Sequence, residues 1–140
     1  SNTDKLGLTD FAKISSRMNI LLVEDSRDNR MLIKLHLKKK PYQIDVAENG
    51  IEAVEKFKEN NYDLVLMDIQ MPEMDGYQAT REIREWEKEQ NLAATPIAAL
   101  TAYALEKDAK RALEVGCNDH LAKPIKKESL FKLIDKYKTD

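Results

Sequence analysis

The chain has 140 residues, 42% of them hydrophobic, which suits one globular domain with a single core. Its 23 basic and 25 acidic residues nearly cancel, so the charge offers no basic footprint for nucleic acid. No apolar run approaches the roughly 20 residues that span a membrane, and we expect no membrane contact by this domain. The single cysteine, Cys117, excludes an internal disulfide and fits a reducing cytoplasm.

The first 17 residues are polar, with apolar residues at a spacing of three at Leu8, Phe11 and Ile14. This pattern is typical of a linker from a neighbouring domain, which we favour, or of a short amphipathic helix. We therefore expect residues 1–17 to be a linker or short N-terminal helix and residues 18–138 to form the folded domain. The chain does not begin with Met, which favours excision from a longer protein.

The first half of the folded part predicts a strand, a helix and a second strand. The apolar run at 20–23 predicts a buried strand, and Ser26 is a suitable N-cap for a helix to about residue 39. Two apolar stripes run along that helix, Met31, Leu32 and Leu35 forming one and Ile33 and Leu37 the other. The second stripe could meet a flanking helix of the same domain or a partner helix. Residues 42–47 alternate between apolar and polar, as in an edge strand.

The alternation of strand and helix continues without internal repeats. The remaining predicted elements are a helix at 50–59, a strand at 64–67, a helix at 77–89, a strand at 96–100, a helix over 105–113 that ends by Gly116, a strand at 119–122, and a last helix carrying an apolar stripe from 130 to 137. Five such alternations predict an α/β fold, a doubly wound parallel sheet with five helices on its two faces. The apolar strands should be central and the polar ones at the edges, which matches the order 2-1-3-4-5.

In that order the first and third strands are neighbours, and acids follow both. Glu24 and Asp25 come after the first strand, and Asp68 ends the third. Carboxylates about 4 Å apart repel by roughly 4 kcal/mol per pair at an effective dielectric near 20, so such a cluster needs a cation or raised pKa values. Mg²⁺, or Mn²⁺ in its place, suits Asp25 and Asp68 as direct ligands, Glu24 through water and the main-chain carbonyl of Gln70. Taken alone, the acid pair would favour helix capping.

Two further residues are expected at the same edge of the sheet. Lys123 follows the last strand and could place an ammonium beside a phosphoryl group. The alternative is a surface position, which is more common for a lysine. Thr101 ends the fourth strand and would place a hydroxyl beside the acids, or it could cap the next helix.

Together these residues resemble the response-regulator receiver domains of two-component signalling. Glu24-Asp25, Asp68, Thr101 and Lys123 match the family's acidic pair, phosphoacceptor, switch hydroxyl and lysine in order, with the flanking pairs Met71-Pro72 and Lys123-Pro124. The segment 67–77 and the sequence Glu-Asp-Ser followed by Asn29 are most like the receivers of hybrid sensor histidine kinases. The resemblance implies a flavodoxin-like fold and covers nearly the whole chain.

The resemblance also implies the chemistry and the partners. Asp68 would accept a phosphoryl group from a phosphohistidine with Mg²⁺ and Lys123, and the phosphoryl oxygens would then draw in Thr101. The donor would be a histidine kinase domain, and the onward partner a histidine phosphotransfer domain. A cytoplasmic monomer is expected, as part of a membrane-anchored hybrid kinase if the chain is excised. His120 stands where the family usually has a Tyr or Phe switch residue, so coupling could be weaker or pH-sensitive, or His120 could simply face solvent.

Four alternatives are weighed against this resemblance. The chain could be a stand-alone regulator that acts by protein–protein contact. A phosphatase of the haloacid dehalogenase type also uses an aspartate nucleophile, but it needs an acid two residues later, where Gln70 stands. An unphosphorylated binding module would have lost an acid or the lysine, and a flavin or dinucleotide protein would need a glycine-rich first loop in place of Glu-Asp-Ser-Arg.

Overall fold

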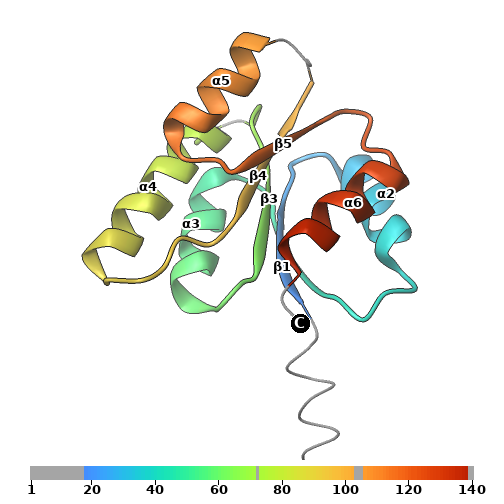
Figure 1. The fold of residues 1–140 in the computed structure, drawn as a ribbon, viewed down its shortest axis with the longest axis horizontal. Helices are drawn as coiled ribbons and strands as arrows, with labels where there is room; N and C mark the ends of the chain where they lie inside the picture. The colour runs from blue at the N-terminus through green and yellow to red at the C-terminus, as the bar shows by residue number, and fades with distance from the viewer. Residues whose placement is uncertain (1–17, 72, 103–105, 139–140) are drawn as a thin grey trace, which may run out of the picture.

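The computed structural model describes residues 18–71, 73–102 and 106–138; the segment 1–17 expected to be a linker or helix lies outside them. Strands and helices alternate along these residues, and the helix labels start at α2 (Figure 1). The elements are β1 (Asn19–Val23), α2 (Arg27–Leu37), β2 (Gln43–Ala47), α3 (Gly50–Glu59), β3 (Leu64–Asp68), α4 (Gly76–Glu89), β4 (Ile97–Thr101), α5 (Glu106–Val115), β5 (Asp119–Ala122) and α6 (Lys127–Tyr137). None of the helices in these described ranges is long and apolar enough to cross a membrane.

The five strands form one parallel sheet in the order β2-β1-β3-β4-β5. This confirms the predicted order, with the apolar strands β1, β3 and β4 in the centre and the polar strands at the edges. Figure 1 shows the sheet nearly edge-on, with α2 and α6 on one face and α3, α4 and α5 on the other. The C-terminal ends of the parallel strands therefore meet along one edge, which is where the predicted site residues were expected.

Each central strand supplies two cores, because successive side chains point to opposite faces of a sheet. On β1, Leu21 and Val23 pack toward the α3–α4–α5 side, and Ile20 and Leu22 pack toward the α2–α6 side. All four side chains are fully buried. A strand buried on both faces has to be apolar throughout, which explains the continuous hydrophobic runs in the sequence.

Local capping sets where the helices begin and end. The side chains of Ser26, Asn49 and Asp75 accept hydrogen bonds from the backbone N–H groups three residues later and cap α2, α3 and α4. Gly116 follows α5 with a φ of 113°, so it is the expected C′ residue in the left-handed region. Because Ser26 caps α2, the acid pair before it is left free for another role.

The orientation of α2 shows which of its two apolar stripes is buried. Ile33 and Leu37, the stripe expected to meet a flanking helix of the same domain or a partner helix, are 1% and 2% exposed and share a core cluster with the strands and with α6. Met31 and Leu35, from the other stripe, are 58% and 65% exposed. Both stripes are equally apolar in sequence, so periodicity alone could not select the inward face. Tertiary packing selects it, because Ile33 and Leu37 share one core cluster with residues of β1 and β3.

Candidate functional site

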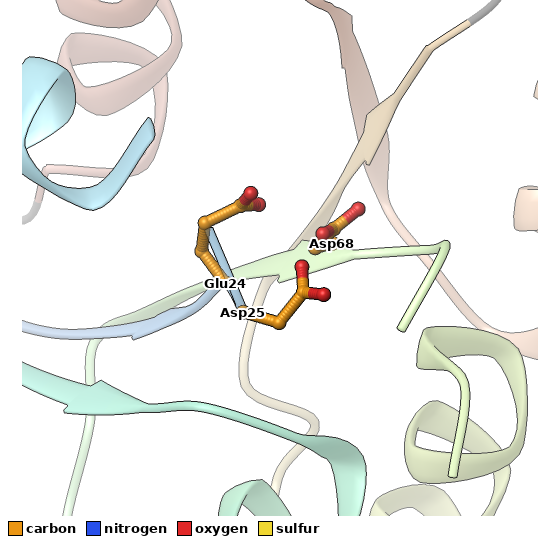
Figure 2. A group of neighbouring side chains, drawn as sticks. All are labelled: Glu24, Asp25 and Asp68. Carbon is orange, nitrogen blue, oxygen red and sulfur yellow. The ribbon is translucent and has the colours of Figure 1, made fainter. Parts of the chain in front are cut away.

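The three acids meet at the C-terminal edge of the sheet. Val23 pairs with Met67 across β1 and β3, so the residues that follow the two positions are neighbours. One carboxylate oxygen each of Glu24, Asp25 and Asp68 lies within 4.8 Å of the others. Figure 2 shows the Asp25 and Asp68 carboxylates directed toward the same space, with Glu24 leaving the adjacent strand end. Residues separated by more than 40 positions in sequence thus form one cluster.

Glu24 is completely buried and held by named partners. Its Oε1 accepts hydrogen bonds from Asn29 Nδ2 at 2.9 Å and from Lys123 Nζ at 3.3 Å. Its Oε2 lies 3.1 Å from Lys123 Nζ as an ion pair, without the geometry of a hydrogen bond. A buried carboxylate needs such compensation, because burial without a partner is costly. Asp25, in contrast, is exposed to solvent.

Asp68 is the centre of the cluster and is 1% exposed. Its Oδ1 accepts a hydrogen bond from the backbone N–H of Gln70 at 3.2 Å and lies 3.0 Å from Lys123 Nζ. Its Oδ2 is buried and accepts no hydrogen bond from the described residues. Burial, and then the neighbouring Glu24, raise the pKa of Asp68 to about 7, although Lys123 opposes the change.

Lys123 follows the edge strand β5 and extends across the C-terminal edge of the sheet to the acids. Its backbone N–H donates to the carbonyl of Thr101 at 2.7 Å, which places the lysine directly after β5 and beside β4. The peptide bond from Lys123 to Pro124 is cis. Burial alone would lower the pKa of the ammonium, but its contacts with Asp68 and Glu24 raise it, so it stays charged. The surface-lysine alternative is therefore wrong.

The remaining predicted site residues are Thr101, Gln70 and His120, and they differ in burial and position. Thr101 is buried at the end of β4, next in the sheet to Ala122. The residues that would show whether Thr101 caps the next helix lie outside the described ranges. Gln70 is exposed and borders an open cleft of about 560 Å³ together with Thr101 and Tyr77. His120 is exposed on the edge strand β5 and does not join the acids.

The donor set fits a hard divalent cation. Lys123 supplies one positive charge against three carboxylates, and two buried oxygens, one on Glu24 and one on Asp68, accept no hydrogen bond among the described residues. The ligands on offer are all oxygens, and one of the three acids is open to solvent. Magnesium prefers such sites, with one or two carboxylates and several retained waters.

Comparison with known proteins identifies the arrangement. The profile of the response regulator receiver domain family matches residues 20–135. The chain belongs to this family. The receiver is 45% identical over 145 residues to hybrid signal transduction histidine kinase B of Dictyostelium discoideum, a match that covers 96% of this chain and 7% of that protein. The receiver thus spans a small fraction of the curated relatives it matches.

Solved structures agree with the family and the fold. One is a chain of the co-crystal structure of the Saccharomyces cerevisiae histidine phosphotransfer protein Ypd1 and the receiver domain of its downstream response regulator Ssk1, with a TM-score of 0.84, 36% identity and coverage of 87% of this chain and 89% of that one. Another is the receiver domain of the Pseudomonas aeruginosa sensor histidine kinase PA1611, whose active-site cleft coordinates a magnesium ion (TM-score 0.76, 40% identity, coverage of 86% and 97%).

The receiver also contains site contacts that the sequence did not predict. Asn29 donates to Glu24, and Arg30 donates to the backbone carbonyls of Glu24 and Asp25. Arg111 of α5 stacks on the Tyr77 ring at 4.3 Å, beside the cleft at Gln70 and Thr101. The contacts of Asn29 and Arg30 could have been predicted, because both residues lie in the first turns of the helix that follows the acids. The contact between α4 and α5 could not have been predicted from the sequence, because it depends on tertiary packing.

Proposed function

We propose that Asp68 of this receiver accepts a phosphoryl group from a phosphohistidine and thereby takes part in a phosphorelay. The observation that carries the proposal is the contact of Lys123 Nζ with Asp68 Oδ1, at 3.0 Å, in a cluster of three acids. A surface acid would not need a half-buried ammonium and two neighbouring carboxylates. A phosphoacceptor needs both, because the ammonium and a cation held by the carboxylates neutralise the negative charge of the transferred group.

In the proposed reaction an Asp68 carboxylate oxygen attacks phosphorus in line with the leaving imidazole. The P–O bond forms, the P–N bond breaks, and the imidazole leaves with the electron pair and takes up a proton. Lys123 is placed to stabilise negative charge on a phosphoryl oxygen, since its ammonium already lies beside Asp68. The backbone N–H of Gln70 holds Oδ1 and fixes the orientation of the carboxylate.

A divalent cation completes the proposed site. Asp25 and Asp68 would be direct ligands, with the carbonyl of Gln70, and Glu24 would act through water. Bound Mg²⁺, or Mn²⁺ in its place, would supply positive charge at the equatorial phosphoryl oxygens and lower the pKa of Asp68 from its value near 7. The P. aeruginosa receiver with magnesium in its active-site cleft supports this assignment.

The proposed partners are a histidine kinase domain and a histidine phosphotransfer domain. The relatives named hybrid histidine kinases and the likeness to a receiver crystallised with Ypd1 support this choice. The domain would then work in the cytoplasm as part of a longer kinase. The second candidate is a stand-alone regulator that acts by protein–protein contact through the same phosphorylation.

The test is phosphorylation of the domain by a small acyl-phosphate donor with Mg²⁺, followed by intact mass measurement. We expect a single phosphoryl adduct that depends on the divalent cation, with Mn²⁺ able to replace Mg²⁺. The adduct should be absent from Asp68→Asn and present in Asp135→Asn, which changes an exposed acid on α6. An adduct that persists in Asp68→Asn would contradict the proposal. Phosphorylated phosphotransfer domains, added in place of the small donor, would distinguish the relay from the stand-alone regulator.

Switching is proposed to depend on Thr101 and to be modified by His120. Thr101 is buried beside the acids, whereas His120 is an exposed side chain on β5. Replacing His120 by Tyr restores the residue usual in the family. We expect His120→Tyr to increase the ratio of partner affinities between the phosphorylated and unphosphorylated forms by about fivefold, the lower end of the usual range of allosteric coupling. Equal ratios for the two proteins, measured by titration calorimetry, would show that His120 has no part in the switch.

A further inference from the structure

Arg30 connects the helix α2 to the backbone that carries the two acids. Its Nη1 donates to the carbonyl oxygen of Glu24 at 3.0 Å and to that of Asp25 at 3.1 Å. Its Nη2 lies 3.4 Å from a carboxylate oxygen of Glu48, in the segment between β2 and α3. The Arg30 side chain is 17% exposed, whereas the Glu48 side chain is 65% exposed. One guanidinium therefore holds two consecutive peptide groups.

The segment that Arg30 holds has little other support. Residues 24–26 join β1 to α2 and belong to neither element, and the last sheet-like hydrogen bond is the one from Glu24 N–H to Ala47 at 3.0 Å. The Glu24 side chain is buried and fixed by Asn29 and Lys123. The Asp25 side chain is exposed, so its direction depends on the orientation of its own peptide groups.

We infer that Arg30 is a positioning residue for the magnesium site, which directs the Asp25 carboxylate toward Asp68 by holding the carbonyls of Glu24 and Asp25. The inference rests on the proposed function, because it assumes that Asp25 binds the cation. A residue that hydrogen-bonds to metal ligands without binding the metal can contribute strongly to metal affinity, because it fixes the orientation of the ligands. Arg30 does not touch the phosphoryl group in this scheme.

The charge of Arg30 acts in the opposite direction, and this makes the inference testable. A cation near the acids would weaken Mg²⁺ binding by repulsion, whereas orientation of Asp25 would strengthen it. The guanidinium faces two carbonyl dipoles directly, and the exposed Glu48 adds only a weak ion pair at 3.4 Å. Orientation is therefore expected to outweigh repulsion.

The experiment measures the Mg²⁺ dissociation constant of the unphosphorylated domain by titration calorimetry, with Mn²⁺ binding by electron paramagnetic resonance as a second probe. Trp86 is unsuitable as a fluorescent reporter, because it packs against Phe57 on α3, away from the acids. Arg30→Lys keeps the charge, but its nitrogen ends one bond nearer the backbone than Nη1, which donates to both carbonyls. Arg30→Gln removes the charge. We expect both variants to bind Mg²⁺ about tenfold more weakly.

Three controls separate positioning from charge and from stability. Arg27→Gln removes an exposed arginine one turn earlier, and Glu48→Gln removes the ion pair of Arg30 but leaves the carbonyl contacts; both should bind Mg²⁺ within twofold of the wild type. Ile33→Ala destabilises α2 from its buried face and should likewise leave the affinity of the folded protein unchanged. A purely structural Arg30 would behave like Ile33.

The outcomes are distinct. Unchanged affinity in Arg30→Lys together with tighter binding in Arg30→Gln would overturn the inference, because repulsion would then be the main effect. Unchanged affinity in both variants would overturn it as well. A wild-type domain that binds no Mg²⁺ would instead contradict the proposed function, and this result comes from the unmutated protein alone.

Discussion

At the scale of single residues, Asp68 shows how the fold changes the chemistry of a side chain. An exposed aspartate has a pKa near 4, whereas burial beside Glu24 raises the pKa of Asp68 to about 7. The ammonium of Lys123 limits this change but does not cancel it. The Asp68 carboxylate is therefore costly to ionise unless a divalent cation binds beside it. This property suits a group that is proposed to bind a cation and accept a phosphoryl group.

This raised pKa predicts a pH-dependent stability in the absence of divalent cations. Between about pH 4 and pH 7 the folded chain holds a proton on Asp68 that the unfolded chain has lost, so the free energy of unfolding falls as the pH rises. Asp68→Asn removes this titration. We expect the free energy of unfolding at about pH 8 to rise by about 2 kcal/mol, less than the full pKa shift implies because the ion pair with Lys123 is also lost. Urea unfolding of both proteins across this pH range provides the measurement.

At the scale of secondary-structure elements, α2 has two apolar stripes and only one of them is in the core. Ile33 contributes to the core between the sheet and the α2–α6 layer, and Leu35 faces solvent at 65% exposure. The same helix begins at the Ser26 cap and carries Asn29 and Arg30, which contact the acid pair. Its rotation about its own axis therefore determines both the packing and the polar contacts of the site.

The two stripes predict a matched pair of stability changes. Ile33→Ala removes a fully buried side chain, so it should lower the free energy of unfolding by about 3 kcal/mol. Leu35→Ala removes an exposed one, and Ala is the better helix former, so the change should stay within about 0.5 kcal/mol. Chemical denaturation of the two variants would show whether the inward face is the one described. Equal losses would contradict the observed rotation of α2.

At the scale of the whole molecule, Arg84 joins elements that are distant in sequence. From α4, its guanidinium donates to Gly116 after α5 at 2.9 Å, to Glu87 at 2.7 Å and to Asn118 before β5 at 2.8 Å. Asn118 in turn accepts from the N–H of Ile97 on β4 at 2.9 Å. These bonds hold the N-terminal edge of the sheet together, at the opposite end from the acids.

Removing the buried acid of this network should destabilise the fold. The Glu87 side chain is 4% exposed, and its second oxygen accepts from the N–H of Thr95 at 2.7 Å. Glu87→Ala removes the carboxylate that pairs with Arg84 and leaves the N–H of Thr95 without its acceptor, and we expect a loss of about 3 kcal/mol in the free energy of unfolding. Glu85→Ala, an exposed acid two residues earlier, should cost less than about 0.5 kcal/mol. Similar denaturation midpoints for the two variants would argue against a role for the network.

Cation binding should also act on the whole molecule. A ligand that binds only the folded state raises its stability, by about 2.7 kcal/mol at a concentration one hundred times the dissociation constant. We therefore expect the thermal midpoint to rise with added Mg²⁺ and to fall again with a chelator. Asp25→Asn should abolish most of the rise, and Asp135→Asn should keep it. A rise that survives in Asp25→Asn would place the cation elsewhere.

The sequence by itself determined the elements, their order in the sheet and the residues at the acidic edge. Strand and helix periodicities and caps such as Ser26 are local signals, and the chain alternation then allows few topologies. Only the tertiary structure decided which stripe of α2 faces inward, that Lys123 contacts both Glu24 and Asp68, and that Arg30 holds the acid-bearing backbone. Those features depend on the rotation and spacing of packed elements, which residues close together in the sequence do not encode.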